Sequence, residues 1–174
     1  LKVKRQNIIP YGDRIVFGMT AAWIFGRLGC TLSHDHPGLH SDFFLAVAYP
    51  GGSRHDLGFY EWLMTLVLMA IFIVMARKPR RSGLFMATAF LIYAPVRFAF
   101  DFLRISSGEW ADRRYAGLTP AQYGVTALFA LGVYLLVTLD KRPMDVALWP
   151  KREPRPRAEN PPETAENNSE NASL

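Results

Sequence analysis

An apolar segment in the middle of the chain carries charged side chains at helical spacing. Residues 83–103 read GLFMATAFLIYAPVRFAFDFL, in which Tyr93, Arg97 and Asp101 are four residues apart. Residues at this spacing lie on one face of an α-helix, and Arg104 follows about one turn later. An arginine or aspartate at the bilayer centre costs about 2.5–3.5 kcal/mol on insertion scales, so such residues usually face a protein interior or a water-filled cavity. The pattern predicts a functional polar stripe, with mutual neutralisation of Arg97 and Asp101 as the alternative.

Two further charged residues are expected at the same depth. Arg27 lies near the end of the apolar run 15–30, and Glu61 lies in the first turn of the run 58–76. Guanidinium groups form paired bonds to phosphate oxygens, so Arg27 and Arg97 beside a cavity predict a site for a phospholipid headgroup. The alternatives are an Arg27 that snorkels to the interface and a Glu61 that the helix dipole stabilises.

The runs that hold these residues predict an all-α integral membrane protein with about four transmembrane helices. The chain has 174 residues, 50% of them hydrophobic, and a mean hydropathy of only +0.06 because a polar C-terminal segment offsets the apolar runs. About 20 apolar residues suffice to cross a bilayer. The predicted helices cover residues 15–30, 58–76, 83–103 and 120–139 of a transmembrane domain over 15–142. Thr119 is predicted as the N-cap of the last helix, with Pro120 at its first position.

Flanking charge predicts the orientation of these helices. The loop after the second run holds four basic residues, Arg77, Lys78, Arg80 and Arg81. Positive charge in short loops marks the cytoplasmic side. Residues 1–14 are therefore predicted as a cytoplasmic lead-in, and 143–174 as a disordered cytoplasmic tail, because this segment is too polar to form a core. Since the chain opens on Leu1, we expect an N-terminal part to precede it. The basic residues lie at the ends of apolar runs, so no nucleic-acid partner is expected.

One polar loop, residues 31–57, contains every histidine of the chain, and the predicted orientation places this loop outside the cytoplasm. The histidines are His34, His36, His40 and His55. Imidazole and carboxylate groups are good ligands for zinc or iron, so His34, Asp35, His36 and His40 indicate a metal-dependent membrane hydrolase as an alternative. Their spacing matches no strong metal signature, and a single cysteine, Cys30, excludes an internal disulfide and a zinc site made of cysteines. We predict neither a metal nor another cofactor.

Four segments, in order, resemble the bacterial prolipoprotein diacylglyceryl transferase family. They are GRLGC at 26–30, RHDLGFYEW at 54–62, the helix at 83–104 and GLTPAQ at 117–122. They are similar to the family's Gly-Arg-x-Gly motif, its Arg-His-Pro-x-x-Leu-Tyr-Glu motif, its Tyr-x-x-x-Arg-Phe-x-x-Glu-Phe-x-Arg helix and its Leu-x-x-x-Gln helix start. The resemblance covers about residues 15–140 and marks a divergent member, since Cys30 stands where asparagine is common and Asp101 where glutamate is.

The resemblance implies a multi-pass enzyme of the bacterial cytoplasmic (inner) membrane. Such an enzyme transfers the diacylglyceryl group of phosphatidylglycerol to the lipobox cysteine of a prolipoprotein signal peptide. By motif position, Arg27 and Arg97 would bind the headgroup and stabilise the leaving phosphate, while Tyr93, Asp101 and Glu61 would orient the arginines and the lipid. The partners implied are phosphatidylglycerol, the prolipoprotein and the lipid bilayer.

The thiol of the substrate needs a base near neutral pH, and His55 stands at the histidine of the Arg-His-Pro motif. The predicted catalytic residues are Arg27, Arg97, His55 and Glu61. The predicted phosphatidylglycerol-binding residues are Arg27, Tyr93, Arg97, Asp101 and Arg104. An inactive lipid-binding paralogue is a further alternative, against which the retention of Arg27 and Arg97 argues, because buried charge without a use is costly.

Overall fold

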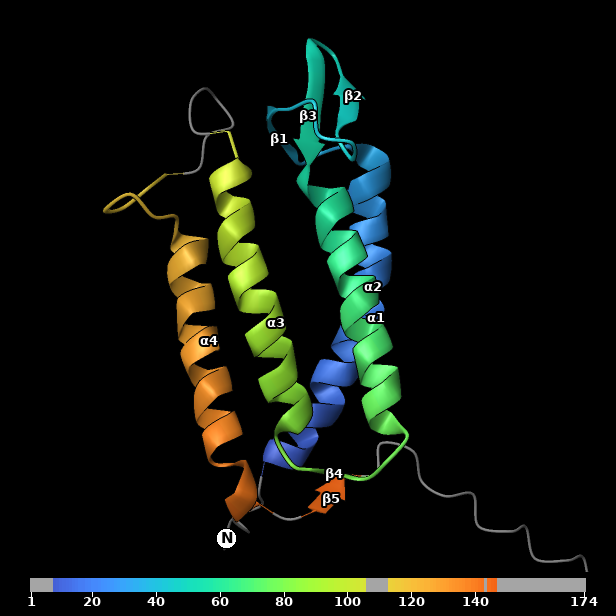
Figure 1. Ribbon diagram of the computed structural model, residues 1–174, viewed down its shortest axis with the longest axis vertical. Coiled ribbons are helices and arrows are strands. Elements are labelled where there is room, and N and C mark those ends of the chain that lie inside the picture. The colour runs from blue at the N-terminus through green and yellow to red at the C-terminus, as the bar shows by residue number, and fades with distance from the viewer. Residues whose placement is uncertain (1–7, 106–112, 143, 147–174) are drawn as a thin grey trace, which may run out of the picture.

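The computed structural model describes residues 8–105, 113–142 and 144–146, which form four long helices with a small sheet at each end (Figure 1). The helices are α1 (Ile9–Ser33), α2 (Leu57–Ala76), α3 (Leu84–Phe100) and α4 (Pro120–Val137). A short 3-10 helix, Asp101–Leu103, continues α3. These four helices, the third taken together with its 3-10 continuation to Leu103, are long and apolar enough to cross a membrane, which confirms the predicted helical membrane fold.

The helices pack mainly in two pairs, α1 against α2 and α3 against α4 (Figure 1). The pairs meet in an apolar core of Leu68 and Phe72 from α2 and Phe85 and Ala89 from α3. Phe17 of α1 stacks on Phe72 with ring centroids 5.9 Å apart, and Phe72 meets Phe85 edge-on at 5.2 Å. This core joins the helices in the half of the molecule nearer the loop between α2 and α3, and leaves the other half free for polar side chains.

The polar loop between α1 and α2 forms a three-stranded antiparallel sheet in the order β1-β3-β2. Its strands are β1 (Pro37–His40), β2 (Val47–Tyr49) and β3 (Gly52–Asp56). The turn between β2 and β3 uses Gly51 at φ 92°, a conformation that glycine adopts without strain. A single bridge from Gly38 to Arg104 attaches the sheet to the end of α3. We call this end of the molecule the histidine end.

A two-stranded sheet lies at the opposite end, where β4 (Arg80–Arg81) pairs with β5 (Met144–Val146). Arg81 also donates hydrogen bonds to the carbonyl oxygens of Asp140, at 2.8 Å, and Arg142, at 3.1 Å. The first residues of the predicted disordered tail therefore include a strand, which the basic loop holds in place. Residues 143 and 147–174 of that tail lie outside the part of the chain that the structure describes.

The first helix is longer than the predicted run 15–30. Pro10 lies in its first turn, where the missing N–H removes no helical hydrogen bond. Asp13 is fully buried, and its carboxylate accepts hydrogen bonds from the backbone N–H groups of Gly83 at 2.5 Å and Met86 at 3.0 Å. Asp13 belongs to the predicted cytoplasmic lead-in, but in the structure it lies within α1 and caps the start of α3. The rest of the predicted lead-in lies outside the described residues.

Candidate functional site

Two arginines from different helices converge on one buried carboxylate. Nη2 of Arg27, on α1, lies 2.6 Å from Oε2 of Glu61, on α2. Nε of Arg97, on α3, lies 3.4 Å from Oε1 of the same residue. The Glu61 side chain is only 1% exposed. Three helices that are separate in sequence are therefore joined at a single carboxylate.

The sequence predicted Glu61 in the first turn of its helix, but in the structure Glu61 lies beyond the first turn of α2. Asp56 is the N-cap of this helix, and its side chain accepts a hydrogen bond from the backbone N–H of Phe59 at 3.0 Å. The helix dipole acts mainly on the first turn, so the arginines and not the dipole stabilise the Glu61 carboxylate. Oε2 of Glu61 is buried and lies against Nη2 of Arg27, so the ion pair with Arg27 holds this side of the carboxylate.

A second carboxylate, Asp101, completes the network at the end of α3. Arg97 donates to it from one helical turn earlier, and Nε of Arg104 lies 3.3 Å from the same oxygen. The hydroxyl of Thr119, the N-cap of α4, donates to the other carboxylate oxygen at 2.5 Å. Arg114 donates to the Asp101 backbone carbonyl at 3.3 Å. Asp101 therefore joins the end of α3 to the start of α4.

These residues form one group, which we call the arginine cluster: Arg27, Glu61, Arg97, Asp101, Arg104 and Arg114. The cluster contains four guanidinium groups and two carboxylates, a formal excess of two positive charges. Arg27, Arg97 and Arg104 contact the carboxylates, and Arg114 bonds to a backbone carbonyl. Charge of this kind in a partly buried place favours the binding of an anion, and guanidinium groups suit phosphate oxygens. The structure thus brings together the predicted residues Arg27, Glu61, Arg97, Asp101 and Arg104.

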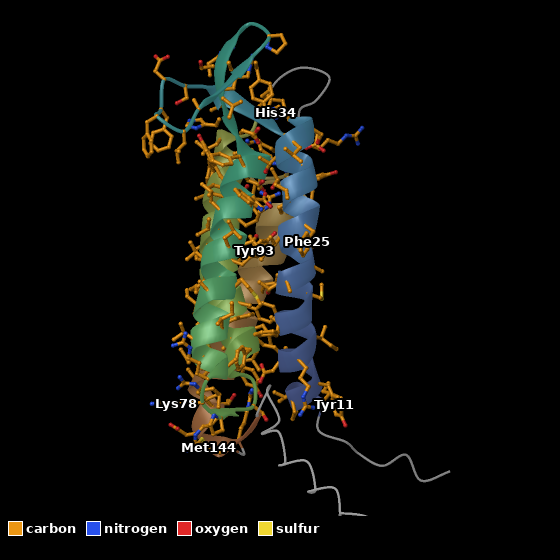
Figure 2. The ribbon with its side chains drawn as sticks, turned by 90° about the vertical axis from the view of Figure 1, so that its right-hand side faces the viewer. Tyr11, Phe25, His34, Lys78, Tyr93 and Met144 are labelled. Carbon is orange, nitrogen blue, oxygen red and sulfur yellow. The ribbon has the colours of Figure 1, made fainter. Side chains whose placement is uncertain are left out.

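Tyr93 lies one turn before Arg97 and lines an apolar groove of about 330 Å³ between the helices. Figure 2 shows Tyr93 along the length of the helices, with His34 near one end and Lys78 near the other. The groove is also lined by Val16, Met19, Thr20, Trp23, Thr65, Leu68, Ala89, Phe90 and Leu128. Trp23 connects groove and cluster, because the Arg27 guanidinium lies 5.1 Å above its ring. On α1 and α3 the groove residues lie farther from the histidine end than Arg27 and Arg97, so the groove lies nearer the middle of the helices than the charges.

The predicted base His55 lies apart from this convergence. Its Nδ1 is 2.9 Å from the hydroxyl oxygen of Tyr60, and the two rings meet nearly edge-on. Both line a separate pocket of about 370 Å³ with Phe43, Leu45, Leu63, Phe100 and Leu103. The base role of His55 stays a prediction.

The histidines of the polar loop take different partners and do not form one ligand set. Nδ1 of His34 lies 2.7 Å from Oδ2 of Asp56, while Nδ1 of His36 bonds to the neighbouring Asp35. The hydroxyl of Tyr49 donates to the same oxygen of Asp56 at 2.9 Å. Burial and this bond to the Asp56 carboxylate raise the pKa of Tyr49, so its hydroxyl stays a donor at neutral pH. The geometry does not support the metal site of His34, Asp35, His36 and His40.

Two residues that organise the site were not predicted to do so. Asp56 directly precedes the apolar residues that begin α2, and an aspartate in this position is an N-cap signal. Thr119 was predicted as the N-cap of the last helix, which the structure confirms together with a capping box from Gln122. Its bond to Asp101 depends on how α3 and α4 pack, and no local sequence pattern predicts this packing.

Four apolar spans around a partly buried cluster of arginines and carboxylates define a multi-pass membrane protein with a cationic cluster next to an apolar groove. The family model described as prolipoprotein diacylglyceryl transferase matches residues 1–138. The chain belongs to the prolipoprotein diacylglyceryl transferase family.

Curated relatives named phosphatidylglycerol--prolipoprotein diacylglyceryl transferase support this assignment. The protein of Chromohalobacter salexigens is 30% identical over 70% of this chain and 47% of its own length. Those of Idiomarina loihiensis and Campylobacter lari are each 26% identical, over 80% and 77% of this chain and 53% and 49% of their own lengths. The chain thus spans about half the length of the curated relatives it matches. No solved structure matches it significantly.

Proposed function

We propose that this chain transfers the diacylglyceryl group of phosphatidylglycerol to the lipobox cysteine of a prolipoprotein. The names of the relatives supply the two substrates. The observation that carries the proposal is the convergence of Arg27 and Arg97 on Glu61 next to an apolar groove. This arrangement suits a lipid whose charged head and apolar chains must be held at adjacent depths.

The arginine cluster and the groove bind different parts of the lipid. The phosphate of phosphatidylglycerol binds between the guanidinium groups of Arg27 and Arg97, and its acyl chains occupy the groove beside Tyr93. Asp101 fixes Arg97 and Arg104 through its carboxylate, which keeps the guanidinium groups in place before the lipid arrives.

The reaction replaces one bond at a glycerol carbon. The cysteine thiolate attacks the carbon that bears the phosphate, a C–S bond forms, and the C–O bond to phosphate breaks. The electron pair of that bond leaves with glycerol phosphate, and a base takes the thiol proton. Negative charge therefore grows on the phosphate oxygens in the transition state, where preorganised cations supply the largest stabilisation. Arg27 and Arg97 have this role, Glu61 orients them, and His55 stays the predicted base.

The basic loop and the position of the arginine cluster along the helices support a location and an orientation in the membrane. We place the protein in the bacterial cytoplasmic membrane with the basic loop, Arg77 to Arg81, on the cytoplasmic side. The arginine cluster then lies toward the opposite leaflet and the histidine end lies outside. A lipobox segment would reach the cluster from that side.

Transfer of label tests the proposal. Membranes that contain the protein receive phosphatidylglycerol labelled in its diacylglyceryl group, together with a lipobox peptide. We expect label on the peptide, loss of that label with Arg97→Ala, and normal transfer with Arg77→Ala, which removes an exposed arginine at the opposite end. Failure of folded protein to label the peptide, or full activity of Arg97→Ala, would overturn the proposal and leave the lipid-binding paralogue as the alternative.

A further inference from the structure

Three side chains with different metal-binding groups meet just beyond the arginine cluster. Cys30 of the last turns of α1 and Asp35 and His36 of the following loop each offer one donor atom, and these atoms all lie within 4.8 Å of one another. Thiolate, imidazole and carboxylate are the three donor types that bind zinc in proteins. This set differs from the predicted metal ligands of the loop, His34, Asp35, His36 and His40. It contains Cys30, the single cysteine of the chain, in place of His34 and His40.

The backbone holds the three residues in this arrangement. α1 ends at Ser33, and His34 takes the left-handed conformation, φ 50° and ψ 39°, which folds the chain back over the helix end. A non-glycine residue keeps this conformation only when its surroundings fix it, and here the buried Asp56 holds the His34 ring at 2.7 Å. Residues 35 and 36 therefore return to the level of Cys30.

The start of α2 anchors both sides of the group. The carbonyl of His36 accepts a hydrogen bond from the backbone N–H of Leu57 at 3.1 Å. On the other side, α1 and α2 approach closely at Cys30, where a Cβ atom on Gly58 would lie 3.2 Å from the Cys30 backbone and side chain. The loop and the helix end are thus fixed to the same element, so only side-chain movement is needed to bring the donors together.

We propose that Cys30, Asp35 and His36 bind a zinc ion, with water in the remaining position. Tetrahedral zinc at about 2.0–2.3 Å from each donor needs the donors roughly 3.5 Å apart. A pair at the 4.8 Å limit must therefore approach by about 1 Å, which side-chain rotation can supply. Binding releases the Cys30 thiol proton to solvent and replaces the hydrogen bond between Asp35 and His36 by two bonds to the metal. The side chains of Asp35 and His36 are 50% and 28% exposed, so the ion can enter from water.

The position of the site gives the ion an effect on the neighbouring cluster. Cys30 follows Arg27 by three residues, hence by about one helical turn, and Arg27 holds Glu61. Zinc with one thiolate and one carboxylate leaves one positive charge more than the metal-free group of thiol, carboxylate and neutral imidazole. It therefore adds positive potential beside Arg27 and fixes the loop to α1.

Cobalt binding to the purified full chain tests the site, because a cobalt–thiolate bond gives a charge-transfer band in the near ultraviolet. We expect this band at one equivalent of Co²⁺, its disappearance when Zn²⁺ displaces the cobalt, and its loss with Cys30→Ser. Loss of a group that merely supports a ligand already costs roughly 10- to 100-fold in metal affinity, so Asp35→Asn and His36→Gln should weaken zinc binding by at least that factor. His40→Gln, in the same loop and exposed, is the matched control and should bind normally.

Protection of the cysteine gives a second measurement that needs no variant. Because Cys30 is the one cysteine of the chain, alkylation reports on it alone. Zinc should slow its reaction with a maleimide at least 10-fold, and a chelator should restore the rate. Absence of the cobalt band in folded wild-type protein, a band that survives Cys30→Ser, or alkylation that zinc leaves unchanged would each overturn the proposal. None of these readouts depends on transferase activity.

Discussion

Arg97 makes contacts that only a guanidinium group can make together. It reaches the carboxylates of Glu61 and Asp101 from one side chain, although these lie on different elements. The planar fork of arginine offers several donors in fixed directions, whereas lysine carries a single compact charge. The identity of this side chain, and not only its charge, should therefore matter for binding a phosphate.

We expect Arg97→Lys to lower the rate of label transfer by roughly 10- to 100-fold, the equivalent of one lost hydrogen bond to a charged group. The measurement is the initial rate at saturating phosphatidylglycerol in membranes. Arg77→Lys at the exposed opposite end is the matched control and should transfer normally. Equal rates for the Arg97 variant and wild type would mean that the fork geometry has no role.

Asp56 is the residue on which the histidine end depends most. Its buried carboxylate accepts from the Phe59 backbone and the Tyr49 hydroxyl and also bonds the His34 ring. Asp56→Ala removes the N-cap of α2 and leaves partly buried donors without this acceptor, so we expect a loss of about 2–4 kcal/mol in unfolding free energy.

Unfolding in detergent measures this loss. Asp42→Ala removes an exposed aspartate of the same loop and should change stability by less than about 0.5 kcal/mol. Equal unfolding free energies for Asp56→Ala and Asp42→Ala would show that the bonds to Asp56 do not hold the sheet on α2.

At the scale of elements, the start of α3 depends on a residue of α1. Asp13 accepts from the N–H groups of Gly83 and Met86, which are among the donors that a helix start leaves without partners. Asp13→Ala should cost about 2–4 kcal/mol in unfolding free energy, because one buried and one partly buried donor lose their acceptor.

Arg14→Ala is the control for Asp13→Ala, since Arg14 is the next residue of α1 and is exposed. Thermal unfolding in detergent should show a clear decrease only for the Asp13 variant. Normal stability of that variant would show that water or another group can cap α3 equally well.

The elements that the sequence predicted well are those with a local signal. Runs of apolar residues predicted the four spans, and Thr119 followed by Pro120 predicted the start of α4. The sheet at the histidine end was not predicted, because its strands are short and pair through a turn at Gly51 instead of showing long alternation. The early start of α1 was missed because Asp13 looks solvent-exposed until its partners on α3 are known.

In the site, too, features that depend on spacing within one helix were predicted, and contacts between helices were not. Spacing along α3 placed Tyr93, Arg97 and Asp101 on one face, and the structure brings Arg97 and Asp101 into contact. The meeting of Arg27 with Glu61 depends on how α1 packs on α2, as does the position of Cys30 beside Gly58. Such contacts between helices leave no periodic trace in either helix.

For the whole molecule, the four spans and the basic loop predict one orientation. In a Cys30→Ser background, His40→Cys should react with a membrane-impermeant maleimide added outside intact cells. Lys78→Cys should react only after the membrane is opened. Both native residues are exposed, so access to the side of the membrane decides the result. The reverse pattern would place the arginine cluster in the cytoplasmic leaflet and contradict the proposed entry side of the prolipoprotein.

The stoichiometry of the products tests the transferase function most directly. Purified protein in lipid vesicles receives phosphatidylglycerol and a lipobox peptide, and mass spectrometry counts the glycerol phosphate released and the thioether formed. We predict one glycerol phosphate for each diacylglyceryl group on the peptide cysteine, and neither product when the cysteine of the peptide is replaced by serine. Release of glycerol phosphate without the peptide, or peptide that carries only a fatty acyl group, would contradict diacylglyceryl transfer by the arginine cluster.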